Sequence, residues 1–245
     1  MKFIVNGAKG RMGTQIVAQL NLEECPHELL AGVDISAKEG DGFFSKLSDV
    51  TENADCIIDF SHHSATREIC EYAKKTKTPV LFATTGQTED ELELIKDCSH
   101  FIPVFMSANM SVGIAVLAKF AKEAAFAMPD ADIEIIERHH NKKLDAPSGT
   151  ALLLANEIKK VRTDSEFVCG RSGMGKRQKN EIGIHAIRTG STIGVHEIVI
   201  STDTETITLK HEAHTRKLFE EGAIAAAEYI ANMPSGFYTM YDLIN

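Results

Sequence analysis

The stretch Lys2-Phe-Ile-Val-Asn-Gly7-Ala-Lys-Gly10-Arg-Met-Gly13 decides the fold of this 245-residue chain. A short apolar run is followed by three glycines and then by apolar residues at helical spacing over 11–20. Strand, glycine turn and helix in this order open a β-α-β unit, because glycine permits the tight turn and a close approach of the backbone to a ligand. The N–H groups at the helix start then face an anion such as a pyrophosphate.

Short apolar runs alternate with helical patterns through the first hundred residues. We expect strands at 2–6, 29–34, 55–60, 79–83 and 101–105, and helices at 11–20, 64–75 and 89–98. This alternation predicts parallel β-α-β units and therefore a Rossmann-like, doubly wound parallel sheet in an α/β protein.

The pattern changes in the second half of the chain. Helices are expected at 111–128 and 150–161, a strand at 132–138, and a polar loop with four cations at 171–180, which we interpret as solvated. Period-2 segments at 181–188, 194–202 and 206–211 predict an antiparallel meander. A final amphipathic helix at 217–232 is expected to return to the first domain.

Two domains follow from these patterns. Residues 1–110 and 214–245 are expected to form the dinucleotide-binding domain, and residues 111–213 an α+β domain with a mainly antiparallel sheet. The segments at 107–113 and near His214 are candidate hinges, because cofactor and acid chemistry lie on different domains and closure is then expected.

Composition excludes several classes of protein. The net charge of −9 argues against a nucleic-acid partner, and no apolar run approaches the length needed to span a membrane. Five widely spaced cysteines without a Cys-x-x-Cys pair indicate reduced thiols in a cytoplasmic protein. The N-terminus runs straight into a strand, which leaves no room for a signal peptide.

The residues near the glycine turn indicate which ligand it could bind. Asp34 ends the second expected strand and is placed to accept a hydrogen bond from a ribose hydroxyl. Lys9 and Arg11 could instead bind a 2′-phosphate. The spacing G-x-x-G-x-x-G differs from the commonest dinucleotide fingerprint, so a glycine-rich turn beside surface charges is the alternative interpretation.

A second informative stretch is Glu134-Ile-Ile-Glu-Arg-His139-His140-Asn-Lys-Lys143-Leu-Asp145-Ala-Pro-Ser148-Gly149, followed by Thr150. Adjacent histidines on extended backbone point to opposite sides and should have different roles. Lys143 can donate a proton, Asp145 can orient a neighbouring donor, and Ser148 can cap the next helix. The N–H groups of Gly149 and Thr150 then form a carboxylate site.

Two other interpretations of this segment are weighed against that one. It can be a polar loop with incidental histidines. It can also be a metal site built from Glu137, His139, His140 and Asp145, although helical His-x-x-x-His spacing is missing and nearby lysines repel a cation. We expect no metal.

Residues 134–152 resemble the signature of the 4-hydroxy-tetrahydrodipicolinate reductase family, also called dihydrodipicolinate reductases, of lysine and diaminopimelate synthesis. The similarity extends over the whole chain and includes Gly7–Gly13, Asp59-Phe-Ser61, Thr84-Thr-Gly86, Ser107-Ala-Asn-Met-Ser-Val-Gly113 and Glu181-Ile-Gly-Ile-His185. The chain differs where members commonly have Gly-Thr-Thr-Gly (here Ala83 comes first) and a Gly-Gly-type pair (here Thr189-Gly190).

The resemblance implies NADH or NADPH as cofactor, a cyclic imine dicarboxylate as substrate, and a homotetramer assembled by the sheets of the second domain. It implies His139 as proton donor and acceptor and Lys143 as proton donor. The implied substrate-binding residues are His140, Lys143, Ser148, Gly149 and Thr150. The implied cofactor-binding residues are Gly7, Ala8, Lys9, Gly10, Arg11, Met12, Asp34, Ala83, Thr84, Thr85, Ser107, Ala108, Asn109 and Met110.

Hydride addition to the conjugated imine creates a centre that must be protonated, which His139 and Lys143 fit. From Asp34 we expect dual cofactor use with some preference for NADH. The competing functions are another NAD(P)-dependent dehydrogenase of amino or keto acids, and a non-enzymatic dinucleotide-binding regulator.

Overall fold

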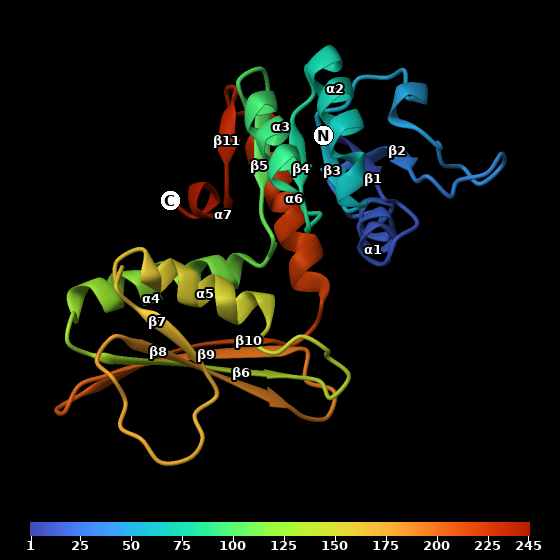
Figure 1. Ribbon diagram of the computed structural model, residues 1–245. Coiled ribbons are helices and arrows are strands. Elements are labelled where there is room, and N and C mark those ends of the chain that lie inside the picture. Colours follow the sequence, from blue (N-terminus) through green and yellow to red (C-terminus); the bar gives the residue numbers. More distant parts are fainter. The chain divides into compact units, whose positions relative to one another are not determined.

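A six-stranded parallel sheet is the centre of unit 1, which comprises Met1–Met110 and Lys217–Asn245 in a computed structural model that describes all residues from 1 to 245 (Figure 1). The strand order is β11-β5-β4-β3-β1-β2. The strands are β1 Lys2–Asn6, β2 Glu28–Val33, β3 Cys56–Asp59, β4 Val80–Phe82, β5 Pro103–Met106 and β11 Gly236–Tyr238. The predicted Rossmann-like parallel sheet is confirmed.

Two layers of helices bury this sheet. Helices α1 (Arg11–Leu20) and α6 (Lys217–Ala231) pack together on one layer, and α2 (Thr66–Thr76) and α3 (Glu89–Ser99) form the other. Sheet residues such as Ile57 and Phe82 meet Ile69 and Ile95 of the helices and are fully buried. Burial of each such side chain contributes about 1.5–3 kcal/mol to the free energy of unfolding. The short helices are η1 Leu47–Asp49, η2 His63–Ala65 and α7 Met240–Leu243.

Unit 2, Ser111–Arg216, contains a five-stranded mixed sheet in the order β10-β9-β6-β8-β7. Its helices α4 (Val112–Ala127) and α5 (Gly149–Lys159) pack together and lie on one face of the sheet (Figure 1). The strands are β6 Asp132–His139, β7 Glu166–Cys169, β8 Glu181–Arg188, β9 Gly194–Ser201 and β10 Thr206–Ala213. None of the chain's helices combines the length and apolar character needed to cross a membrane.

The predicted antiparallel meander is wrong in its pairing. Strands β9 and β10 form the expected hairpin, but β8 does not pair with β9, because β6 lies between them. β6 runs parallel to β8 and antiparallel to β9, and its Ile135 stands between Ile184 and Ile198. All three side chains are buried, so hydrophobic matching with the central strand outweighs the short connection from β8 to β9. Taken together, the antiparallel pairs β6–β9 and β9–β10 join more residues than the parallel pairs β6–β8 and β7–β8, so the sheet is mainly antiparallel.

Side chains of β6 alternate strictly between the two faces of the sheet. Ile133, Ile135, Glu137 and His139 are buried on the side of the helices. Glu134 is on the other face, which neither helix covers (Figure 1).

The cations of the 171–180 loop are held by acidic residues rather than only by solvent. Arg177 donates to Glu134 (3.2 Å) and to Asp132 (2.8 Å), and Arg171 contacts Glu181 at 2.7 Å. The interpretation of the whole loop as solvated is therefore wrong at these two arginines, which hold it against the interior strands β6 and β8.

Candidate active site

The glycine turn between β1 and α1 is possible only without side chains at two positions. Gly7 has a φ of +78°, and a Cβ there would lie 2.7 Å from the backbone of Phe60. A Cβ at Gly13 would lie 2.0 Å from the carbonyl oxygen of Gly7. Gly10 is the N-cap of α1 and provides no side-chain acceptor for the first turn. The turn therefore leaves the start of α1 suited to an anion.

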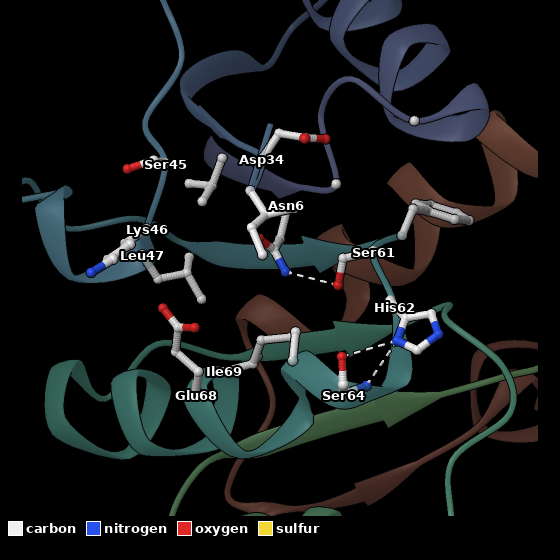
Figure 2. A pocket seen from close by; sticks show the side chains of 16 residues that line it. Asn6, Asp34, Ser45, Lys46, Leu47, Ser61, His62, Ser64, Glu68 and Ile69 are labelled. Carbon is white, nitrogen blue, oxygen red and sulfur yellow. Dashed lines mark hydrogen bonds between the residues drawn. The ribbon is translucent and has the colours of Figure 1, made fainter. Parts of the chain in front are cut away.

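A cavity of about 370 Å³ opens beside this turn, entirely within unit 1 (Figure 2). Gly7, Gly10 and Asp34 are the expected cofactor residues that line it. Figure 2 shows Asp34 on one side of the cavity, and Glu68 and Ile69 on another. The residues of its wall that sequence reasoning missed are Asn6, Val33, Ile35, Ser45, Lys46, Leu47, Phe60, Ser61, His62, Ser64, Ala65, Glu68 and Ile69.

Asp34 is held in place by its own chain. Its carboxylate accepts hydrogen bonds from the backbone N–H of Lys9 (2.9 Å) and from the N–H and hydroxyl of Ser36 (2.9 and 2.6 Å). Burial opposes ionisation, but the bonds from Ser36 and Lys9 outweigh it and lower the pKa of Asp34. The Lys9 ammonium is paired with Asp41 at 2.6 Å. The Asp34 carboxylate therefore faces the cavity while the Lys9 ammonium is paired with Asp41, and Lys46 is a second cation in the cavity wall.

A buried carboxyl, Asp59, ties together the loops around the turn. It accepts from Asn6 at the end of β1 (2.9 Å), from Ser61 (2.6 Å) and from the Thr84 hydroxyl after β4 (2.7 Å). Burial raises the pKa of Asp59, which these hydrogen bonds partly offset. The three loop starts are thus held in one arrangement by a single side chain.

The other expected cofactor residues do not line this cavity. Thr84 is committed to Asp59, while Ala8 and Met110 are buried and offer no accessible side chain. The Ser107 hydroxyl donates to the carbonyl of Asn109 (2.7 Å), which shapes its own loop. The residues in question are Ala8, Lys9, Arg11, Met12, Ala83, Thr84, Thr85, Ser107, Ala108, Asn109 and Met110.

A second polar cluster lies at the end of β6 in unit 2. The Glu137 carboxylate is fully buried and accepts from His139 Nδ1 (2.6 Å), from both terminal nitrogens of Arg188 (2.8 and 2.9 Å) and from the Ser148 N–H (3.0 Å). Burial alone would raise the pKa of Glu137, but the bonds from Arg188, His139 and Ser148 lower it. Glu137 is therefore an ionised carboxylate that joins β6, β8 and the start of α5.

His139 is buried beside a second histidine, His196 of β9. Their rings meet edge to face with centroids 5.2 Å apart. Burial lowers the pKa of His139, partly offset by Glu137. Burial and the proximity of His139 lower the pKa of His196 to about 3, so His196 is neutral. A Cβ at Gly194 would lie 3.2 Å from His139 Nε2, so the glycine leaves space beside that nitrogen.

The Lys143 ammonium contacts the Asp145 carboxylate at 2.8 Å. That hydrogen bond lowers the pKa of Asp145, and the Gly149 N–H at the start of α5 contributes to the same effect. Ser148 is the N-cap of α5, and its hydroxyl accepts from the N–H of Ala151 (3.2 Å). The expected cap and the orientation of a donor by Asp145 are thus present. In the structure the Asp145 carboxylate is the anion that lies at Lys143 and at the start of α5.

The expected residues of this segment therefore fall into two groups in the structure. His139 is buried with Glu137, whereas Lys143 and Asp145 form a pair near the start of α5. His140 is half-buried, and its Nδ1 has no hydrogen-bond partner. Arg188 and His196 were missed as functional neighbours, and Glu137 was named only as a ligand of the alternative metal site. For Glu137 a signal existed, because it shares the parity of Ile133 and Ile135 and so belongs to the buried face.

Two family models together match nearly the whole chain. Residues 1–110 match the family described as dihydrodipicolinate reductase, N-terminus, and residues 113–244 match dihydrodipicolinate reductase, C-terminus. The 4-hydroxy-tetrahydrodipicolinate reductase of Caldanaerobacter subterraneus subsp. tengcongensis is 44% identical, with 100% of this chain and 98% of that one covered. The Clostridium novyi reductase is also 44% identical, over 99% and 98%.

Solved structures are similar to this chain over nearly its whole length. The dipicolinate-bound dihydrodipicolinate reductase of Paenisporosarcina sp. TG-14 superposes with a TM-score of 0.80 at 25% identity, covering 98% of this chain and 97% of that one. A DAP dehydrogenase of C. glutamicum has a TM-score of 0.62 at 10% identity, covering 100% and 95%, which shows a shared fold alone. On the full-length sequence matches, the chain belongs to the dihydrodipicolinate reductase family.

Proposed function

We propose that the chain reduces 4-hydroxy-tetrahydrodipicolinate to tetrahydrodipicolinate through two prepared sites: the cavity beside the glycine turn for the dinucleotide, and residues 139–150 for the substrate. The reductase activity and the use of NAD(P)H follow from membership of the family over both parts of the chain. The observation that carries the residue assignment is the ionised cluster at the end of β6, next to a lysine and a helix start that already bind a carboxylate.

The cavity of unit 1 fits a dinucleotide. The uncapped start of α1 suits the pyrophosphate, and Asp34 suits a ribose diol, because its ionised carboxylate lies in the cavity wall. We infer a preference for NADH over NADPH, because the Asp34 carboxylate repels a 2′-phosphate and the Lys9 ammonium is occupied by Asp41. Arg11 is exposed and does not line the cavity, which supports the same preference.

The substrate dicarboxylate is proposed to take the place that Asp145 now holds at Lys143 and the start of α5. Gly149 has open space where a side chain would be, which suits the close approach of a carboxylate to its N–H. His140, with its unpartnered Nδ1, and Thr150 complete the proposed binding residues, and Ser148 holds the helix start in place.

The nicotinamide, when bound, supplies the hydride. The protein's part is to hold the diacid and to move protons. We assign Lys143 as the proton donor, because its ammonium is partly exposed and pairs with the Asp145 carboxylate, whose place the diacid is proposed to take. His139 is assigned as the group that exchanges a proton at Nε2, because its Nδ1 is occupied by Glu137. Well-placed groups of this kind accelerate reactions by about 10²–10⁴-fold.

A homotetramer is proposed on the uncovered face of the second sheet. Ile136 and Val199 are half-buried there and Ile187 is exposed, although neither helix of unit 2 reaches them (Figure 1). The same face also has charged side chains such as Glu134 and Glu197, and a sheet face that mixes apolar and charged groups suits contact with another copy of the chain. We also propose a cytoplasmic enzyme, since its cysteines are unpaired thiols, four of them wholly or partly buried.

A coupled assay tests the proposed function. Purified chain is supplied with the aldolase product of pyruvate and aspartate semialdehyde, and absorbance is followed with NADH and NADPH in parallel. Oxidation of both cofactors with a higher kcat/KM for NADH supports the proposal. Oxidation only with amino or keto acids would favour another dehydrogenase, and binding of NADH without any oxidation would favour a regulator.

A further inference from the structure

We propose that Glu137, held by Arg188 and by the Ser148 N–H, is the positioning residue for His139: it keeps the ring protonated at Nδ1 and so makes Nε2 the atom that exchanges the reaction's proton. The inference rests on the proposed role of His139. Glu137 acts through the histidine and has no contact with substrate of its own.

The direction of the hydrogen bond follows from the partners of the carboxylate. One oxygen, Oε1, already accepts from Ser148 N and Arg188 NH2 at 3.0 and 2.8 Å. The other, Oε2, accepts from Arg188 NH1 at 2.9 Å and contacts His139 Nδ1 at 2.6 Å. An ionised carboxylate can only accept, so Nδ1 must carry the hydrogen. In the neutral ring, Nε2 then holds the lone pair.

The surroundings of Nε2 are consistent with an atom kept open for chemistry. The nitrogen makes no hydrogen bond within the chain, and Gly194 leaves room beside it, where a Cβ would approach to 3.2 Å. Nε2 therefore first accepts a proton from the substrate: one bond to hydrogen forms at Nε2 while one breaks on the substrate, and the Nδ1–H is kept. The resulting imidazolium lies against the Glu137 carboxylate, and it gives this proton back to the centre that hydride addition creates on the substrate, so that His139 ends neutral again.

The charges around His139 favour this order. Arg188 of β8 neutralises Glu137, Lys143 contributes a nearby positive charge, and His196 of β9 is neutral because burial and His139 lower its pKa to about 3. Burial also lowers the pKa of His139 itself. The histidine is thus neutral before it accepts the proton, while Glu137 stabilises the imidazolium once it has formed.

The first test is Glu137→Gln. The amide must turn its NH2 group toward one pair of donors. Facing His139 is the cheaper choice, because His139 can become an acceptor by changing its tautomer, whereas both partners of Oε1, the Ser148 N–H and Arg188, can only donate. His139 is then forced into the other tautomer. We expect kcat to fall by about 10²–10⁴-fold with the substrate KM and NADH affinity within a few-fold. The acid limb of the kcat/KM profile should move to lower pH, because the imidazolium loses its counter-charge.

Glu134→Gln is the matched control. Glu134 lies on the same strand and pairs with a histidine at a similar distance, His185 Nε2 at 2.7 Å, but on the uncovered face of the sheet. This variant should keep wild-type kcat. Equal losses in the two variants would overturn the inference, since any Glu–His pair on β6 would then have the same effect.

The second measurement needs no variant, so it decides the question even where Glu137→Gln fails to fold. Long-range ¹H–¹⁵N correlation of the wild-type chain should show His139 as the Nδ1–H tautomer with a strongly deshielded Nδ1 proton. An Nε2–H tautomer would overturn the inference. His139→Ala distinguishes the proposed catalytic role of His139 from the proposed positioning role of Glu137. Wild-type turnover in His139→Ala would refute the role of His139 itself. An inactive His139→Ala beside a fully active Glu137→Gln removes only the positioning role.

Discussion

Replacing Lys143 by alanine separates catalysis from stability. The ammonium lies 2.8 Å from Asp145, whose side chain is 57% exposed. An ion pair with so exposed a partner stabilises the fold by roughly 0–1 kcal/mol, so the free energy of unfolding should fall by about 1 kcal/mol at most. The melting temperature should then fall by no more than about 4 °C.

The loss in rate should be much larger. Removal of a well-placed acid costs about 10²–10⁴-fold, which corresponds to roughly 2.7–5.4 kcal/mol in the activation free energy. The substrate KM should also rise, because one carboxylate loses its cation, while NADH affinity stays near normal. The coupled assay and calorimetry are run beside Lys142→Ala, an exposed neighbour that forms no ion pair. Wild-type kcat in Lys143→Ala, or an equal loss in Lys142→Ala, would refute the assignment.

Three further outcomes follow from the site. Asp34→Asn should shift the ratio of kcat/KM values from NADH toward NADPH by about tenfold or more, because the carboxylate that repels a 2′-phosphate is lost; an unchanged ratio would contradict the proposed ribose contact. Gly149→Ala should leave the free energy of unfolding within about 0.5 kcal/mol, since no atom lies within 4 Å of the added Cβ, yet raise the substrate KM severalfold; an unaltered KM would argue against carboxylate binding there. His196 has a pKa lowered to about 3 by burial, so the unfolded chain binds its proton first as pH falls below about 6.5, and stability should decrease by about 2 kcal/mol between pH 7 and pH 5. In urea unfolding His196→Gln should flatten that dependence, and a slope equal to wild type would assign it to other groups.

Local sequence was sufficient for strands β1 to β5 and for helices α1, α2, α3 and α6 of unit 1, because each has its own apolar pattern and its own end signals. Thr88 and Glu91, for example, form a capping box at the start of α3. Strands β7 and β11 were missed, since each has only three or four residues and none of them is buried, whereas the equally short β3, β4 and β5 are mostly buried apolar runs. Strand order in unit 2 was beyond reach for a different reason. Period-2 patterns mark strands but do not say which strand will be inserted between two others, as β6 is.

The candidate site shows the same limit. Lys143, Asp145 and Ser148 are close in the sequence, and their relations follow from the helix start that they precede. Arg188 and His196 lie on β8 and β9, which are distant from β6 in the sequence and pair with it in the sheet. No local sequence pattern therefore predicts that they lie near His139. Thr84 shows another limit: its position after a parallel strand predicts a ligand contact, but nothing in the sequence indicates that its hydroxyl donates to Asp59.

The Asp59 hub has a consequence for how a dinucleotide is received. Loops that end β1, β3 and β4 share one buried carboxyl, so they are ordered when the chain folds rather than when the ligand arrives. Little conformational entropy is then lost in the encounter, and recognition at this edge resembles the docking of two rigid bodies. Because the loops share Asp59, they also depend on it together. Replacing this one carboxyl would remove a hydrogen bond from all three loops at once and make the whole edge of the sheet less ordered.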